Sequence, residues 1–201
     1  MTILKTDTVS GIGNTDGTVF EGDITFDSLN YITLPKGTTN QRVNSAGGRA
    51  VIPGGYNPAG SPNAAKSLNT IEYITIATLG NSQDFGDYTL HTAREGRGSN
   101  SIRAVFGGGT RAEPTISGVI DYITIATKGN ATDFGDLSVS RRDTAGVASP
   151  VRVVFGGGKT PSVSDVMDYV SIATQGNAVD FGNLSEGRDH LAGCSNAHGG
   201  L

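Results

Sequence analysis

Residues 120–137 read IDYITIATKGNATDFGDL, and closely similar stretches occur at residues 71–88 (IEYITIATLGNSQDFGDY) and 167–184 (MDYVSIATQGNAVDFGNL). The first Asp of the Asp-Phe-Gly tripeptide falls at positions 84, 133 and 180, so the copies are 49 and 47 residues apart. Self-similarity at a spacing of this size is typical of repeat proteins, in which each repeat forms one supersecondary unit. We therefore expect most of the chain to consist of three such units.

A second shared element precedes each copy of this stretch. RAVIPGG begins at Arg49, RAVFGGG at Arg103 and RVVFGGG at Arg152, which gives spacings of 54 and 49 residues. The first unit therefore carries a few extra residues, and we place them in the Pro-, Asn- and Ser-rich loop YNPAGSPNAAKS. An apolar segment that ends in glycines predicts a short strand followed by a sharp turn.

The pattern inside each unit predicts β-strands. Ile123 and Ile125 fall on one face of an alternating segment, while Tyr122 and Thr124 fall on the other. The strand before the glycines, a short strand after the Gly-Asn pair and a small-residue inner strand in RRDTAGVAS bring the expected number to four per unit. No segment has a 3.6-residue period long enough for a helix, so the expected fold class is all-β.

The Asp-Phe-Gly tripeptide has a catalytic meaning in protein kinases, where its Asp holds magnesium. No His-Arg-Asp catalytic loop is present, and 201 residues are too few for a kinase domain. We therefore predict that each tripeptide forms a turn, in which the Asp bonds the backbone and the Gly takes a positive φ. The Phe is expected to be an apolar plug between neighbouring units.

Composition narrows the expected partners and location. The formal net charge is −4 and the longest basic run is the pair Arg141-Arg142, so we expect no nucleic-acid partner. No stretch approaches the roughly 18 apolar residues of a membrane helix, and the N-terminus lacks a signal-peptide pattern, so we expect a soluble protein made in a cytoplasm without membrane insertion. The single cysteine, Cys194, excludes an intrachain disulfide and is expected to be buried.

No candidate catalytic or metal-binding residue has a convincing pattern. His91, His190 and His198 fall at unequal places in the repeat and lack the spacing of zinc ligands. The carboxylates of the DFGD segments are too few for calcium without help from elsewhere, and a turn role explains them. We therefore expect no catalytic residue, no metal and no cofactor. The carboxylates concerned are Asp84, Asp87, Asp133, Asp136 and Asp180.

Two further motifs are interpreted as parts of the repeat. FGGGKT ends like a phosphate-binding loop, but Val153 stands where that motif requires its first glycine. Arg142 and Arg188 stand at similar places in their units, and we expect them to bond carbonyl groups between units. A role for these arginines in a binding mouth is the alternative.

The order of these elements resembles a kelch repeat, in which a diglycine follows an apolar strand and spaced aromatic residues come later. The ITIAT-GN-DFG block, the lead-in GTVFEGDITFDSLNYITLPKGTTNQR and the ending SNAHGGL are most similar to kelch-like virion structural proteins of tailed bacteriophages, especially those of marine bacteria. The resemblance implies three kelch-like four-stranded blades, as a partial or oligomer-completed β-propeller. The corresponding positions are Gly54-Gly55, Gly107-Gly108 and Gly156-Gly157, the tyrosines Tyr73, Tyr122 and Tyr169, and, in place of the kelch Trp, Phe85, Phe134 and Phe181.

Residues 1–46 do not match the repeat, and their alternating apolar positions predict two or three strands. We expect an N-terminal β module that attaches the repeats to other virion proteins, with added edge strands of the same sheet system as the alternative. Residues 47–201 then hold the blades, at about 47–101, 102–150 and 151–201. Three blades are fewer than the four to eight of a closed propeller, so we expect a homo-oligomer or burial against another virion protein.

The function implied by this resemblance is that of a non-enzymatic virion structural protein, as an adaptor, fibre or decoration protein on the tail or capsid. The loops after the glycines differ between units, which is how repeat proteins build recognition surfaces. One alternative is a module that binds carbohydrate or a host receptor. Another is a propeller-type enzyme such as an oxidase or sialidase. The expected interaction residues are Tyr56, Asn57, Arg111, Glu113, Lys159 and Ser162.

Overall fold

The computed structural model describes residues 48–59, 67–111 and 115–195, and the expected attachment module at residues 1–46 lies outside these ranges. The described chain is all-β, without helices, and its strands form antiparallel sheets. This confirms the expected fold class. In the same residues there is no helix with the length and apolarity needed to cross a membrane.

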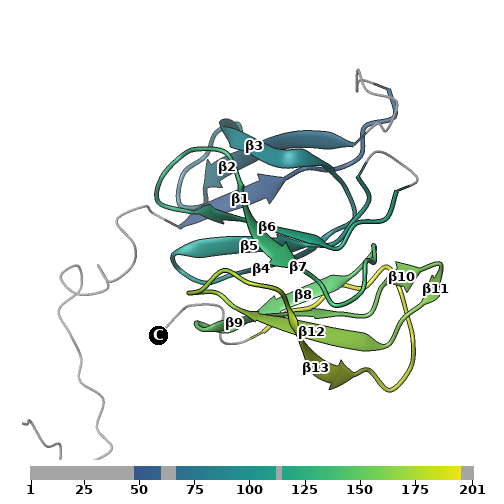
Figure 1. Cartoon of the computed structure of the whole chain (residues 1–201). Coiled ribbons are helices and arrows are strands. Elements are labelled where there is room, and N and C mark those ends of the chain that lie inside the picture. The colour runs from purple at the N-terminus through teal and green to yellow at the C-terminus, as the bar shows by residue number, and fades with distance from the viewer. Residues whose placement is uncertain (1–47, 60–66, 112–114, 196–201) are drawn as a thin grey trace, which may run out of the picture. The chain divides into compact units, whose positions relative to one another are not determined.

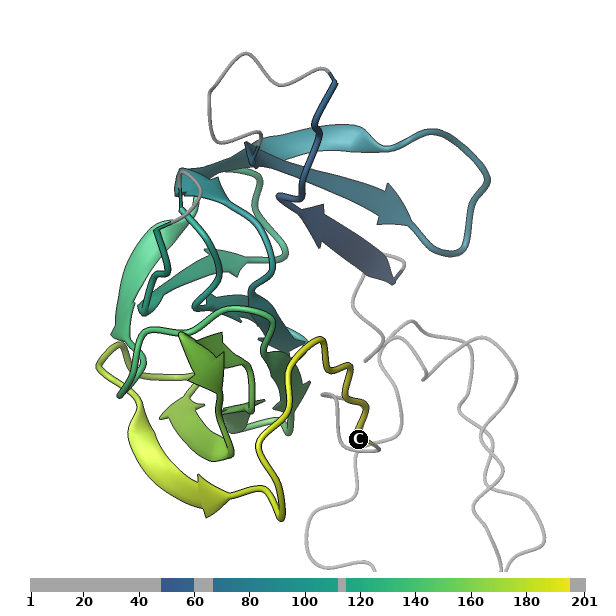
Figure 2. The ribbon, with the colours of Figure 1, turned by 90° about the vertical axis from the view of Figure 1, so that its right-hand side faces the viewer.

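Three sheets of three or four strands follow one another along the chain (Figures 1 and 2). The first has the order β1 (Arg49–Pro53), β2 (Leu68–Thr75), β3 (Gln83–Thr92). The second has the order β4 (Gly96–Ser99), β5 (Arg103–Gly107), β6 (Val119–Thr124), β7 (Thr132–Asp136). The third has the order β8 (Ala145–Ala148), β9 (Arg152–Gly156), β12 (Val166–Ser171), β13 (Val179–Asn183). A hairpin of β10 (Lys159–Thr160) and β11 (Ser162–Val163) follows β9.

The Asp-Phe-Gly tripeptides lie within the outer strands β3, β7 and β13, so the prediction of a turn there is wrong. The pairing register shifts opposite each tripeptide, as it does at a β-bulge. The expected positive φ of the glycines is confirmed, at 149° for Gly86, 146° for Gly135 and 131° for Gly182. The motif is therefore better explained as a β-bulge than as a turn. The Phe is the extra residue in the ladder, and the Gly tolerates the positive φ.

The hydrophobic core lies between consecutive sheets. One cluster joins residues of the first and second sheets, and another joins residues of the second and third sheets. Phe85 is 2% exposed and Phe134 is 3% exposed, so both are apolar plugs between units as predicted. Phe181 occupies the same position in the third sheet but is 49% exposed.

The sheets are out of phase with the sequence repeats. Strand β4 lies within residues 47–101, yet it pairs with β5 in the second sheet. Strand β8 lies within residues 102–150, yet it pairs with β9 in the third sheet. Each of these two sheets therefore takes its inner strand from the preceding repeat, whereas the first sheet has three strands among the described residues.

Candidate interaction surface

The turn after each glycine-ended strand is fixed by the same backbone hydrogen bond. The N–H groups of Gly109 and Gly158 donate to the carbonyl oxygens of Arg141 and Arg188 at 2.9 and 2.8 Å. Three differing loops therefore begin at equivalent points of the three sheets. The same bonds correct one alignment made from sequence, because the structural equivalent of Arg188 is Arg141 and not Arg142.

The first of these loops contains two of the expected interaction residues. Tyr56 is 50% exposed, and the Arg94 guanidinium carbon lies 6.0 Å from the centre of its ring. The side-chain oxygen of Asn57 accepts a hydrogen bond from the Ala59 N–H at 3.1 Å. The loop therefore presents an aromatic ring to solvent beside a cation.

The hairpin β10–β11 contains two more, which it holds close together. Lys159 and Arg142 exchange backbone hydrogen bonds of 2.8 and 3.2 Å, and Ser162 is exposed on β11. Glu113 lies outside the described residues. The expected surface is thus described at Tyr56, Asn57, Lys159 and Ser162, in two separate loops.

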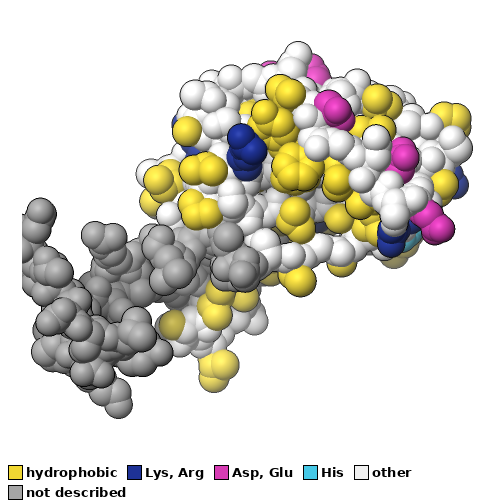
Figure 3. All heavy atoms as spheres, turned by 90° about the horizontal axis from the view of Figure 1, so that it is seen from below, with side chains coloured by type: hydrophobic (Ala, Val, Ile, Leu, Met, Phe, Trp, Pro, Cys, Tyr) yellow, Lys and Arg dark blue, Asp and Glu magenta, His cyan; other side chains and the backbone are white. Residues whose placement is uncertain are grey.

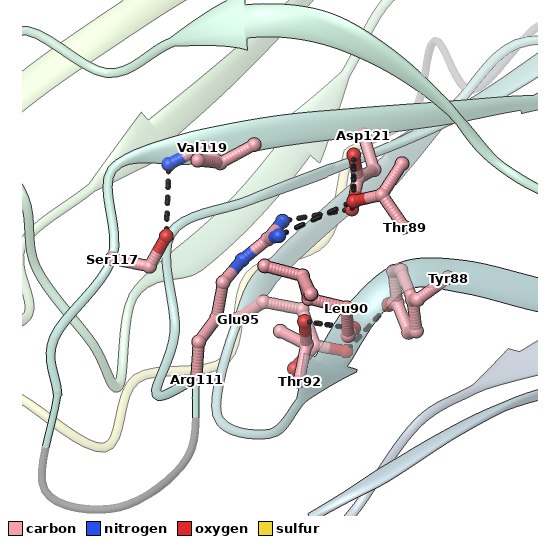
Figure 4. Close-up of polar contacts among 9 residues, drawn as sticks. All are labelled: Tyr88, Thr89, Leu90, Thr92, Glu95, Arg111, Ser117, Val119 and Asp121. Carbon is pink, nitrogen blue, oxygen red and sulfur yellow. Dashed lines mark hydrogen bonds and ion pairs between the residues drawn. The ribbon is translucent and has the colours of Figure 1, made fainter.

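Arg111 is placed differently from the other candidates, because its side chain is buried. Its Nη2 donates to Asp121 Oδ2 at 2.8 Å, and its Nη1 donates to Thr89 Oγ1 at 3.2 Å (Figure 4). The Thr89 hydroxyl is also 2.9 Å from both carboxylate oxygens of Asp121. Burial raises the pKa of Asp121, while the positive charge of Arg111 opposes that shift.

A second buried polar group stands beside the first (Figure 4). The Tyr88 hydroxyl donates to Glu95 Oε1 at 2.8 Å, and Arg97 Nε donates to the same oxygen at 3.0 Å. Arg97 also donates to the carbonyl of Pro53 at 2.8 Å, so it joins the second sheet to the first. Burial and the negative charge of Glu95 raise the pKa of Tyr88 well above its usual value.

The second and third sheets are joined by a similar buried ion pair. Arg141 Nη1 lies 3.0 Å from Asp168 Oδ2, and both side chains are fully buried. The Ser138 hydroxyl donates to Asp168 Oδ1 at 2.7 Å. Burial lowers the pKa of Arg141, and Asp168 opposes the shift. Asp121 and Asp168 are equivalent by repeat, and each accepts a hydrogen bond from a hydroxyl of the preceding unit. These hydroxyl–carboxylate hydrogen bonds act as cross-links between sheets.

One cluster has the donor atoms of a metal site, at Asp143, Asp189 and His190. One ligand atom from each lies within 4.8 Å of the others. His190 Nε2 is 3.7 Å from Asp143, and Arg142 Nε is 3.5 Å from the same carboxylate. Because the Arg142 guanidinium already faces Asp143 and calcium needs six to eight oxygen ligands, we assign the cluster as a polar group around an Arg142–Asp143 ion pair.

No protein-family model matches this sequence, and no curated protein matches it. The candidate site therefore depends on geometry alone. Sequence reasoning missed the buried acids Asp121 and Asp168, although the acidic residue before each repeated Tyr was a visible signal. It also expected Cys194 to be buried, and that is wrong, because Cys194 is exposed.

Proposed function

We propose that this chain is a non-enzymatic structural protein of a bacteriophage particle that acts by protein–protein interaction. Its repeats would be kelch-like blades of a partial propeller, made in the bacterial host and assembled into the virion. The chain would be an adaptor, a fibre component or a capsid decoration protein. The resemblance of the repeated block to phage virion proteins is what suggests the particle.

The observation that carries the proposal is that the buried ionisable groups bond to one another and hold the sheets together. The Arg141–Asp168 ion pair joins the second sheet to the third. The Arg111–Asp121 ion pair lies within one unit, and Thr89 of the first sheet donates to its carboxylate. A catalytic acid or base needs access to a substrate, and these groups are enclosed. The polar chemistry of the described residues therefore supports a scaffold function.

We propose that the scaffold recognises its partner through the loops that follow the glycine-ended strands. Its loops differ in sequence and length while the strands behind them repeat. Variation confined to loops on a constant framework is typical of binding surfaces in repeat proteins. Residues 1–46 would then attach the scaffold to the particle.

A cryo-electron microscopy map of virus particles from a culture that produces this chain tests the proposal. Density for the sheets on the capsid would make the chain a decoration protein. Density on the tail would make it an adaptor or fibre component. Particles that lack the chain, as measured by mass spectrometry of the same preparation, would contradict the proposal.

Carbohydrate or host-receptor binding is a second candidate, because Tyr56 offers an exposed aromatic ring near Arg94. Exposed aromatic faces suit stacking against apolar faces of a ligand. A glycan array with the wild-type chain and Tyr56→Ala tests this candidate. Saturable binding that is lost in Tyr56→Ala but kept in Ser162→Ala would favour it, and an array without binding would contradict it.

A further inference from the structure

The contact between consecutive sheets is made twice inside the chain, with equivalent residues. We call the face that a sheet turns toward the next sheet its trailing face, and the opposite face its leading face. Phe85 and Phe134 are buried on the trailing faces of the first and second sheets. Phe106 and Phe155, 4% and 0% exposed, are their counterparts on the leading faces of the second and third sheets. The chain therefore contains one interface in two copies.

Hydrogen bonds between the sheets repeat in the same way. The Gly129 N–H donates to the Phe85 carbonyl at 2.9 Å, and the Gly176 N–H donates to the Phe134 carbonyl at 2.8 Å. In both places the Gly-Asn segment of one sheet lies against the Asp-Phe-Gly bulge of the preceding sheet. A Cβ on Gly135 would lie 2.5 Å from the Gly176 oxygen, so this approach requires glycine.

An arginine begins each glycine-ended strand, and two of the three arginines span an interface between sheets. Arg49 donates to the Ile125 carbonyl at 2.5 Å, and Arg103 donates to the Ile172 carbonyl at 2.8 Å, in each case in the next sheet. Arg152 is the third member and is exposed. Its guanidinium carbon lies 4.6 Å from the ring centre of the tyrosine on β12, as that of Arg103 lies 4.9 Å from its own tyrosine. Arg152 thus packs on its tyrosine as Arg103 does, and Arg103 makes the contact with the next sheet.

The trailing face of the third sheet exposes the residues that are buried in the other two. Phe181 is 49% exposed, and strands β8, β9 and β12 of the same sheet line an apolar hollow of about 260 Å³. Hydrophobic side chains are numerous on the described part of the surface seen from this side (Figure 3). In the second sheet the equivalent space is filled by Phe155, whose ring would be 2.9 Å from a Cβ on Gly107. The hollow is lined by Ala145, Val154, Gly156, Met167 and Leu184, among others.

The leading face of the first sheet carries the matching set. Ile52 is 46% exposed at the position of Phe106 and Phe155, and Ile76 is 67% exposed at the position of Ile125. The Gly-Asn segment of this sheet begins at Gly80, which is exposed and is equivalent by repeat to Gly129 and Gly176. This face therefore has an apolar projection and an exposed turn, which are the two features that the trailing face of the third sheet would receive.

The two ends also carry complementary charge. Arg141 and Asp168 form a fully buried ion pair at the second internal interface. Their equivalents by repeat are Arg188 and Glu72, and both are exposed. A cation at one end and a carboxylate at the other thus occupy the positions of an ion pair that the chain already makes.

Strand pairing gives a further match. Strand β1 is at the edge of the first sheet, and a hollow of about 280 Å³ lies beside it, lined in part by Val51, Arg97 and Ser99. Residues 191–195 pack across β8, where Ser195 Oγ donates to the Ala148 carbonyl at 2.5 Å. Strands β4 and β8 are the inner strands that pair with β5 and β9. In the same way, this segment would supply the inner strand that pairs with β1 of a second copy.

We propose that the trailing face of the third sheet binds the leading face of the first sheet of a second copy of this chain. The surfaces differ, so the association is head to tail. Two copies joined at both contacts supply six sheets, within the four to eight of closed propellers. The proposal does not depend on the phage assignment. The expected pairs, with the second copy named last, are the hollow with Ile52, the Phe181 carbonyl with the Gly80 N–H, Arg152 with the Ile76 carbonyl, and Arg188 with Glu72.

Light scattering coupled to gel filtration of the full chain is the first test. We expect twice the mass of one chain. The mass of a single chain at the highest soluble concentration would overturn the proposal, because it would mean that the ends are not joined between copies. Circular dichroism on the same samples checks that every variant is folded.

Charge reversal then tests which residues meet. Glu72→Arg and Arg188→Glu each place like charges together, and each is expected to weaken association at least about tenfold. Asp133→Arg, an exposed reversal on β7, is the matched control and should leave the mass unchanged. An equimolar mixture of the two single variants should regain the dimer, because each contact then pairs opposite charges.

The mixture separates the proposal from its alternatives. If Glu72 and Arg188 met within one chain, or if each variant only damaged the fold, mixing would restore nothing, and the proposal would fail. The double variant Glu72→Arg with Arg188→Glu provides a second readout, since it should dimerise alone. A dimer that is insensitive to all of these changes would also overturn it, because it would use another surface.

Discussion

At the scale of single residues, the most demanding interactions are the buried ion pairs. Asp168 is fully buried and faces Arg141, so its removal leaves a buried cation without its counterion. Asp168→Ala is expected to lower the free energy of unfolding by about 3–5 kcal/mol. Urea unfolding followed by circular dichroism measures this. Asp165→Ala, an exposed aspartate close by, is the control, and an equal loss in both variants would contradict the prediction.

Tyr88 predicts a dependence of stability on alkaline pH. Its pKa is raised in the folded protein, mainly by burial and then by Glu95. Its contribution is therefore complete below a pH of about 10, the usual pKa of tyrosine, and is lost as the pH rises through the folded value. Tyr88→Phe should cost about 1 kcal/mol at neutral pH and flatten the fall in Tm above pH 10 or so. Parallel wild-type and variant slopes in that range would show that Tyr88 stays accessible to base.

At the scale of strands, the Asp-Phe-Gly bulge is a docking point for the next sheet. Gly135→Ala combines a positive φ with a Cβ 2.5 Å from the Gly176 oxygen, so we expect a loss of about 2–4 kcal/mol. Gly129→Ala has a positive φ as well but meets no atom within 4 Å, so it measures the backbone strain alone. Thermal unfolding of both variants checks the prediction, which requires Gly135→Ala to be clearly the less stable.

The strands were largely predictable from sequence, and the bulge was not. Alternation in residues 122–125 fixes which side chains share a face, because the period of a strand is two. The tripeptide Asp-Phe-Gly has the composition of a turn, and only the pairing partner decides whether it bends the chain or lies in a ladder. A partner strand is a long-range property, so local composition gave the wrong answer there.

The candidate surface was predictable in part, for a similar reason. Loop positions follow from the glycines, and Tyr56 is exposed as its loop suggested. Arg111 also lies beside a loop, yet it is buried because Asp121 on β6 pairs with it. A charged residue is drawn inside only when a partner compensates its lost hydration, and that partner was not recognised in the sequence.

At the scale of the whole molecule, head-to-tail association makes stability depend on protein concentration. A contact made only between folded copies stabilises the folded state by mass action. The Tm should therefore rise with concentration for the wild-type chain, and Glu72→Arg should need a higher concentration before its Tm begins to rise. Differential scanning calorimetry over a wide range of concentrations measures both, and a constant Tm for the wild type would contradict the prediction.

The exchange of inner strands between repeats has a mechanical consequence. The chain passes from the outer strand of one sheet directly to the inner strand of the next, as from β3 to β4 and from β7 to β8. A force that pulls the two ends of the described chain apart cannot lift one sheet away intact, since it must first shear a strand out of its neighbour. The load is thus carried by hydrogen-bonded ladders whose bonds must break together. The strands shared between repeats therefore make the sheets resistant to tension.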